Sequence, residues 1–181
     1  MLVTFIGAQS TGKTTLFNEL LKNKNLTDVF TFVTETTRTV QKSGLKINED
    51  GDMHTQEAIM KMHEENIKLP NAFLDRSAVD CYVYSLYLAE TGKLTSDDVA
   101  KLHFQFKDLL PSYDVIFYIE PEFSIVDDGV RSVNTSFRDR VASLFKDVIK
   151  DYNIEVVKLS GTVEQRMQTI YNTLRERGIS C

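Results

Sequence analysis

The stretch GAQSTGKT, residues Gly7 to Thr14, fits the pattern G-x-x-x-x-G-K-[ST] at every fixed position. It follows a short apolar run, Leu2–Ile6, which is typical of a buried strand. It leads into Lys13–Asn23, where the apolar residues fall on one side of a helix. In this strand–loop–helix context the pattern forms a loop that binds nucleotide phosphates. The alternative is a glycine-rich turn that only joins a strand to a helix.

The residue types of this phosphate-binding loop (Gly7–Thr14) have distinct uses. Its backbone N–H groups can surround phosphate oxygens, and the helix N-terminus adds positive potential. Lys13 supplies a charge to the β- and γ-phosphates, and the hydroxyl of Thr14 can bind Mg²⁺. Gly161, after the last strand, can let the backbone approach a flat base, and the alternative there is a helix cap at Thr162. We expect the nucleotide to bind at Gly7, Ala8, Gln9, Ser10, Thr11, Gly12, Lys13, Thr14, Thr15 and Gly161.

Strand and helix patterns alternate along the rest of the chain. Strands are expected at Leu2–Ile6, Val29–Thr34, Ala72–Leu74, Val115–Ile119 and Ile154–Leu159. Helices are expected at Lys13–Asn23, Thr55–Lys68, Ser77–Glu90, from a cap at Ser96, at Phe137–Tyr152 and at Thr162–Arg177. Such alternation predicts an α/β fold of the P-loop NTPase type, with a parallel sheet covered by helices on both faces. The length of 181 residues predicts a single domain, residues 1–181.

Composition restricts the class of protein. The net charge of −5 gives no electrostatic footprint for nucleic acid, and no apolar run approaches the 18 residues or more of a membrane span. Cys81 and Cys181 are far apart and share no motif, which favours a reducing compartment. We therefore expect a cytoplasmic protein with neither nucleic acid nor membrane as a partner. The oligomeric state stays open.

Ligands of parallel α/β sheets bind beyond the carboxyl ends of the strands, where FLDRS places two charged residues. Asp75 can hold Mg²⁺ or accept the proton of an acceptor hydroxyl, and the alternative is a cap on the next helix. Arg76 can hold substrate or phosphate, and the alternative is a structural ion pair.

Two further segments carry charges at strand ends. In ETTR, Glu35 can bind or deprotonate an acceptor and Arg38 can hold an acidic group, while a surface ion pair is the alternative. In VDDGVR, Asp127 and Asp128 can contact substrate, and Arg131 can reach the phosphates when the loop closes. The alternative there is an ordinary Asp-Gly turn. We place a lid at approximately residues 121–140.

Gln56 precedes FLDRS on a predicted helix, and its amide can both donate to and accept from a base. The alternative is a solvated glutamine. His54, His63 and His103 show no metal-ligand spacing, and we interpret them as surface or core residues without a catalytic role.

Among nucleotide-binding proteins, a kinase explains more of this pattern than a switch or a motor. The guanine-reading N-K-x-D segment of GTPases is missing, because Asn23-Lys24-Asn25-Leu26 lacks the aspartate and comes too early. A chain of 181 residues leaves little room for the additional parts of a motor. A nucleotide-dependent switch without an acceptor remains the alternative from another class.

The chain resembles the kinase domain of the bacterial NadR proteins, the ribosylnicotinamide kinases, and the wider set of AAA-type P-loop kinases. Four segments carry the resemblance, which spans nearly the whole chain: GAQSTGKTTL, ETTR, FLDRSAVDCYVY and YDVIFYIEPEFSIVDDGVRS. It implies that ATP and Mg²⁺ are used and that the γ-phosphate passes to the hydroxyl of a nucleoside-like acceptor. It assigns Lys13 and Thr14 to phosphate and metal, Asp75 to acceptor and metal, and Arg131 to the lid.

The resemblance makes nicotinamide riboside the first acceptor to consider. The chain has no Trp, and Ile125 stands near the place where the ribosylnicotinamide kinases commonly carry one. The triplet Asp75-Arg76-Ser77 is closer to the deoxynucleoside and thymidylate kinases. A deoxynucleoside or nucleoside-monophosphate kinase is therefore the alternative, and a monophosphate would need additional cations, for which Arg38 and Arg76 are the candidates.

Overall fold

The computed structural model describes residues 1–34, 44–121 and 135–181. Within these ranges, five strands form one sheet in the order β2-β3-β1-β4-β5, and every neighbouring pair is parallel. The strands are β1 (Leu2–Ile6), β2 (Thr31–Val33), β3 (Ala72–Asp75), β4 (Val115–Ile119) and β5 (Val157–Leu159). The predicted α/β fold with a parallel sheet is confirmed, and its central strands β3, β1 and β4 end at the same edge.

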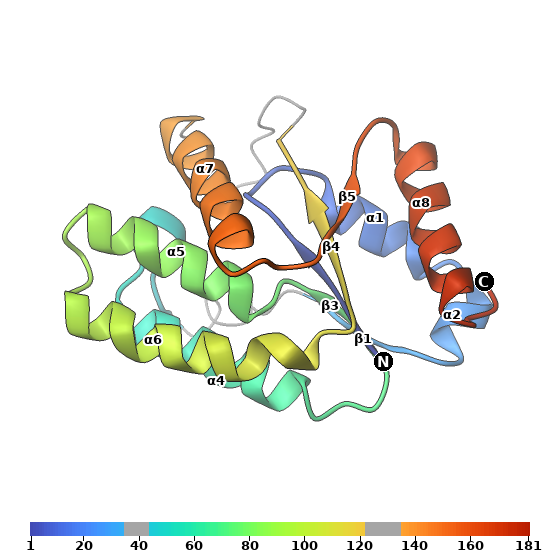
Figure 1. Cartoon of the computed structure of the whole chain (residues 1–181), viewed down its shortest axis with the longest axis horizontal. Helices are drawn as coiled ribbons and strands as arrows, with labels where there is room; N and C mark the ends of the chain where they lie inside the picture. Colours follow the sequence, from blue (N-terminus) through green and yellow to red (C-terminus); the bar gives the residue numbers. More distant parts are fainter. Residues whose placement is uncertain (35–43, 122–134) are drawn as a thin grey trace.

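Helices cover both faces of this sheet (Figure 1). The described α-helices are α1 (Lys13–Leu20), α2 (Lys24–Thr27), α4 (Met53–Asn66), α5 (Ala78–Glu90), α6 (Ser96–Leu109), α7 (Thr135–Asp151) and α8 (Val163–Glu176). Short 3-10 helices lie at η1 (Asn48–Asp50) and η2 (Leu110–Ser112). In Figure 1, α1 and α8 lie on one side of the sheet, and α4, α5, α6 and α7 lie on the other.

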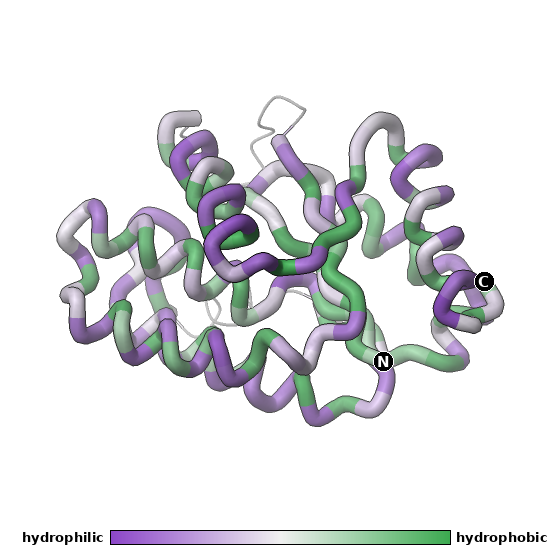
Figure 2. The backbone as a smooth tube through the Cα atoms, viewed as in Figure 1, coloured by the Kyte–Doolittle hydropathy of each residue, from purple (hydrophilic) through white to green (hydrophobic). Residues whose placement is uncertain are grey.

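The alternation of side chains along β1 produces two separate cores. Val3 and Phe5 point toward α1 and α8, whereas Leu2 and Ile6 point toward the layer of α4 to α7. In the first core the Phe5 ring stacks between those of Phe73 and Phe117, with ring centroids 6.2 and 5.2 Å away. Figure 2 shows the hydrophobic residues along the central strands and on the helices beside them. A sheet that is buried on both faces explains the near-continuous apolar strands.

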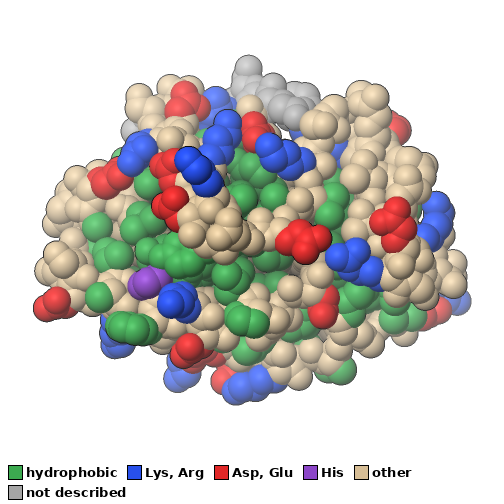
Figure 3. All heavy atoms as spheres, in the orientation of Figure 1, with side chains coloured by type: hydrophobic (Ala, Val, Ile, Leu, Met, Phe, Trp, Pro, Cys, Tyr) green, Lys and Arg blue, Asp and Glu red, His purple; other side chains and the backbone are tan. Residues whose placement is uncertain are grey.

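The face shown in Figure 3 mixes both signs of charge. Lysine and arginine side chains lie interspersed with aspartate and glutamate, around hydrophobic side chains of the α5–α6–α7 layer. Phe104, on α6, is the most exposed large hydrophobic residue of the described ranges. No helix in the described part of the chain is both long and apolar enough to span a bilayer.

Several predicted boundaries needed correction, each for a local reason. The helix expected over Lys13–Asn23 ends at Leu20, because the Asn23 side chain accepts a hydrogen bond from the Asn25 N–H and starts α2. Thr95, not Ser96, is the N-cap of α6, and it forms a capping box with Asp98. The strand expected over Val29–Thr34 is shorter, as β2 covers only Thr31–Val33.

Candidate active site

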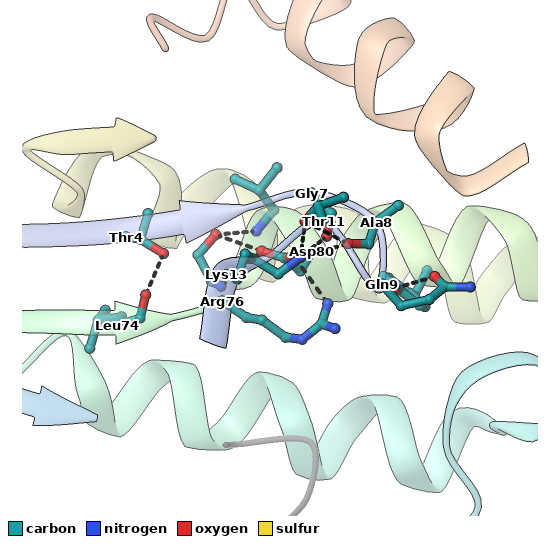
Figure 4. A network of polar contacts seen from close by, with 12 residues as sticks. Thr4, Gly7, Ala8, Gln9, Thr11, Lys13, Leu74, Arg76 and Asp80 are labelled. Carbon is teal, nitrogen blue, oxygen red and sulfur yellow. Dashed lines mark hydrogen bonds and ion pairs between the residues drawn. The ribbon is translucent and has the colours of Figure 1, made fainter. Parts of the chain in front are cut away.

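The phosphate-binding loop joins the end of β1 to the start of α1 (Figure 4). Gly7 has a φ of 139°, and a Cβ atom there would lie 2.4 Å from the carbonyl oxygen of Ile119 on β4. Gly12, with a φ of 91°, is the N-cap of α1 and provides no side chain to cover the helix N-terminus. Both positions require glycine for a physical reason: Gly7 for the close approach to β4, and Gly12 for its left-handed backbone.

The ammonium group of Lys13 lies inside the loop. Its Nζ donates hydrogen bonds to the backbone carbonyls of Gly7 and Ala8, both at 2.6 Å, and to the Thr11 hydroxyl at 3.1 Å (Figure 4). Lys13 is buried, as are Ala8, Gln9 and Thr11. The loop therefore concentrates one positive charge among several backbone groups, the arrangement that suits a phosphate group. Thr14 is half-buried beside it, and the side chain of Thr15 faces solvent.

A buried arginine on α8 also contacts the phosphate-binding loop. Arg166, on α8, donates from Nη1 to the carbonyl of Thr11 at 2.8 Å and from Nε to the carbonyl of Gly161 at 3.0 Å. No motif in KLSGTVEQR marks Arg166 for this role, so the sequence alone does not single it out. Thr162 caps α8 by accepting from the Gln165 N–H, so this cap stands beside Gly161 at the sheet edge. The phosphate-binding loop and the loop after β5 are thus joined by one side chain.

Asp75 is the last residue of β3 and pairs in register with Phe5 of β1. This position places its carboxylate at the sheet edge from which the phosphate-binding loop starts. Asp75 is 9% exposed, and its Oδ1 atom has no hydrogen-bond partner in the described part of the chain. A buried carboxylate oxygen without a partner is unfavourable unless a proton, cation or ligand satisfies it. The carboxylate is therefore a candidate for contact with metal or acceptor.

The start of α5 shows which contacts Asp75 and Arg76 make there. The Ser77 hydroxyl accepts from the Val79 N–H at 3.2 Å, and Asp80 accepts from the Ser77 N–H at 3.0 Å. This capping box leaves no capping role for Asp75, so that interpretation is wrong. Arg76 forms the structural ion pair, with Nη1 3.3 Å from the Asp80 carboxylate.

Arg76 also has a φ of 89°, which is unfavourable for a residue with a side chain. Its guanidinium lies over the Tyr84 ring, 5.4 Å from the ring centroid. Tyr84 in turn donates to the Gln9 side chain at 3.1 Å, so α5 contacts the phosphate-binding loop. Strained residues persist where the surroundings over-determine them, and they cluster at functional sites.

A small cavity of about 20 Å³ lies next to Arg76, between α4 and α5. Its lining residues are Asn48, Gln56, Ile59, His63, Arg76, Asp80, Cys81 and Tyr84. Gln56 is 3% exposed, so the solvated alternative is wrong. The Cys81 thiol, whose pKa burial raises, stays protonated and donates to Gln56 Oε1 at 3.2 Å. A cavity of this size holds about one water molecule or one small polar group.

Several predicted site residues cannot be placed in this geometry. Glu35, Arg38, Asp127, Asp128 and Arg131 lie outside the described residues. Of the lid expected at approximately 121–140, residues 122–134 lie outside as well, and residues 135–140 form the first turns of α7. The structure brings Lys13, Asp75, Arg76 and Gln56 to one edge of the sheet and adds Arg166 and His63, which the sequence analysis did not select.

Comparison with protein families gives one match that covers most of the chain. The family model described as AAA domain matches residues 2–166. No curated protein matches the chain.

Solved structures with the same fold are kinases and related proteins. The NadR protein in complex with NR superposes with a TM-score of 0.77 and 22% identity, over 99% of this chain and 52% of that chain. NadR in complex with NAD and AMP-PNP gives a TM-score of 0.73 and 20% identity, over 99% and 50% of the two chains. Deoxyadenosine kinase from M. mycoides, with products dCMP and dCDP, gives a TM-score of 0.73 and 15% identity, over 98% of this chain and 100% of that chain. The chain therefore has a P-loop fold like that of nucleoside and nucleotide kinases, and spans about half the length of the NadR chains.

Proposed function

The chain belongs to the AAA domain family, and from that premise we propose that it is an ATP-dependent kinase that transfers the γ-phosphate to a hydroxyl of a nucleoside-like small molecule. The observation that carries the proposal is the position of Asp75. Its unpartnered Oδ1 lies at the edge where the phosphate-binding loop begins, and the next residue, Arg76, lines the cavity. Donor site, carboxylate and candidate acceptor cavity are therefore contiguous.

Phosphoryl transfer depends mainly on positioning and on charge stabilisation. Lys13 would stabilise charge on the transferring phosphoryl group from inside the loop. Asp75 would orient the acceptor hydroxyl and accept its proton, or would bind the metal. Glu35, Arg38, Asp127 and Asp128 remain proposed substrate contacts. Arg131 remains a proposed lid residue that reaches the phosphates.

The residues present fit Mg²⁺ at the nucleotide. Thr14 and Asp75 offer a hydroxyl and a carboxylate oxygen, the hard ligands that Mg²⁺ prefers. The described ranges contain no group of three or more His, Cys, Asp or Glu side chains that could hold a metal. Such a sparse protein ligand set is typical of Mg²⁺ that is bound mainly through substrate phosphates and water. When bound, the ion supplies neutralisation of the phosphate charge.

For the acceptor, we propose nicotinamide riboside first. The fold likeness to NadR with NR supports this order. A deoxynucleoside or nucleoside-monophosphate acceptor is the second candidate, supported by the likeness to deoxyadenosine kinase with dCMP. The ion pair of Arg76 with Asp80 favours a nucleoside over a monophosphate as the acceptor. Arg76 is one of the two arginines proposed to bind the phosphate of a monophosphate, and Asp80 already neutralises its charge.

The decisive experiment follows ADP release from ATP and Mg²⁺ with nicotinamide riboside, deoxynucleosides and nucleoside monophosphates as separate acceptors. We expect turnover that requires one class of acceptor, with a phosphorylated product of matching mass. A Lys13→Ala preparation, purified in the same way, measures contaminating ATPase activity. Acceptor-independent ADP release, or no release with any acceptor, would leave the nucleotide-dependent switch as the better description.

A further inference from the structure

His63, on α4, is a buried polar side chain that the proposed reaction does not yet use. It is 1% exposed, and neither Nδ1 nor Nε2 has a hydrogen-bond partner in the described ranges. It lines the cavity on the same face of α4 as Ile59 and Gln56, which lie four and seven residues earlier. Buried polar groups are nearly always hydrogen-bonded, so two orphaned nitrogens on one ring need an explanation.

The other polar side chains of the cavity already have partners. Arg76 pairs with Asp80, and Tyr84 donates to Gln9 of the phosphate-binding loop. The Oε1 atom of Gln56 accepts a hydrogen bond from the Cys81 thiol. The Gln56 amide nitrogen is on the other branch of the same side-chain amide and takes no part in that bond. His63 differs from them because neither of its polar atoms is satisfied by the surrounding protein.

The imidazole is neutral. Burial, together with the positive charge of Arg76, lowers the pKa of His63 to about 3. Asp80 also lines the cavity, but its charge is compensated by Arg76. A neutral imidazole presents one N–H donor and one lone-pair acceptor, and the ligand determines which nitrogen is which. It therefore complements a group that carries a donor and an acceptor side by side.

We propose that His63 is a specificity-determining residue, which selects an acceptor whose ring bears an amide-type pair of hydrogen-bond donor and acceptor. A carboxamide on a pyridine ring and the amide or amidine edge of a nucleobase both have this chemistry. The inference rests on the proposed kinase function, since it assigns the cavity to the polar edge of the acceptor's ring. A site that hydrogen-bonds a polar group rejects the analogue that lacks it, because its own buried polar atoms then stay unpaired.

Calorimetric binding provides a test that does not depend on phosphoryl transfer. The probes are nicotinamide riboside, pyridinium riboside without the carboxamide, and deoxycytidine. The variants are His63→Phe, which keeps a flat ring without nitrogens, and His63→Gln, which restores a donor and an acceptor. His54→Phe, at an exposed histidine in the first turn of α4, is the matched control. Thermal unfolding of each variant verifies its fold.

We expect His63→Phe to weaken binding of the preferred polar acceptor by roughly 10- to 100-fold, while His63→Gln recovers part of the loss. Pyridinium riboside, which has no amide, should bind wild type and His63→Phe equally within about twofold, as in a double-mutant cycle. Preference for nicotinamide riboside or for deoxycytidine identifies whether a pyridine carboxamide or a nucleobase edge supplies the donor–acceptor pair. ATP affinity and the His54→Phe variant should stay unchanged.

Three results would overturn the inference: unchanged binding of the polar acceptor by His63→Phe, an equal loss for pyridinium riboside, or no binding of any probe to the wild type. If His63→Phe does not fold, His63→Gln decides, because an unchanged preference of that variant for the polar acceptor over pyridinium riboside would overturn the inference. Binding that depends on His63 without ADP release would contradict the kinase and leave this inference intact.

Discussion

The guanidinium of Arg166 donates a hydrogen bond of 2.8 Å to the backbone carbonyl of Thr11, a residue 155 positions earlier in the chain. The same side chain donates to the carbonyl of Gly161 at 3.0 Å. Arginine carries several donors in a rigid fork, so its Nε and Nη1 atoms can contact two loops at once. The phosphate-binding loop therefore owes part of its shape to the last helix.

Arg166→Met should loosen this connection. Hydrogen bonds from a charged donor contribute roughly 1.5–3 kcal/mol, so we expect ATP to bind about tenfold more weakly, with a smaller change in kcat. ADP titration and steady-state kinetics measure the two effects. Arg175→Met, at an exposed arginine of the same helix, is the control. A wild-type KM for ATP in Arg166→Met would show that the loop holds its shape without this contact.

Lys13→Ala should abolish turnover, because the ammonium group inside the loop would be lost. Single-turnover assays with excess enzyme measure the residual rate, and ADP titration measures the affinity that remains. Lys22→Ala removes an exposed lysine just after α1 and should keep wild-type activity. Turnover of Lys13→Ala within tenfold of the wild type would refute the proposed role of the phosphate-binding loop.

Asp75→Asn should mainly lower kcat. A general base contributes typically 10²-fold or more, so we expect a decrease of at least about 100-fold with little change in the KM for ATP. Asp97→Asn, at an exposed aspartate in the first turn of α6, serves as the comparison. If kcat of Asp75→Asn stays within about twofold of the wild type, the carboxylate has no catalytic role.

Gly7→Ala should destabilise the fold, because its Cβ would lie 2.4 Å from the carbonyl oxygen of Ile119. Gly92→Ala is the matched control, since Gly92 also has a positive φ, of 74°, but no atom lies within 4 Å of a Cβ there. We expect a loss of roughly 1–2 kcal/mol for Gly92→Ala from backbone strain alone, and a clearly larger loss for Gly7→Ala. Urea unfolding measures both, and equal losses would exclude the clash with β4.

Stability should depend on pH through His63. Its pKa is about 3 in the folded protein, against an ordinary value of 6.5 for a solvated histidine, so between these values the unfolded chain binds more protons. The contribution of His63 to the free energy of unfolding should therefore be complete above pH 6.5 and decrease toward pH 3. The decrease should be at most about 1.4 kcal/mol per pH unit. His63→Phe should remove this component, and the difference between the two unfolding curves isolates it from the carboxylates. Parallel curves would show that the imidazole is not buried in neutral form.

The site could be predicted from the sequence only where its chemistry lies in a continuous motif. GAQSTGKT specifies Lys13 and its loop, and FLDRS specifies Asp75 at a strand end. Gln56 was selected for its hydrogen-bonding capacity, but its burial against Cys81 depends on how α4 packs against α5. His63 was interpreted as a surface or core residue without a catalytic role, because nothing in the sequence shows that its core position borders a cavity.

By itself, the sequence determined the parallel sheet and the phosphate-binding loop, because strand and helix periodicity and left-handed glycines are local properties of the chain. Only the tertiary structure decided which side chains meet at the strand ends. Arg166 reaches Thr11, Tyr84 reaches Gln9, and His63 shares a cavity with Arg76 because helices distant in sequence pack on the same sheet. Such contacts depend on packing geometry, which a single sequence does not encode in any local pattern.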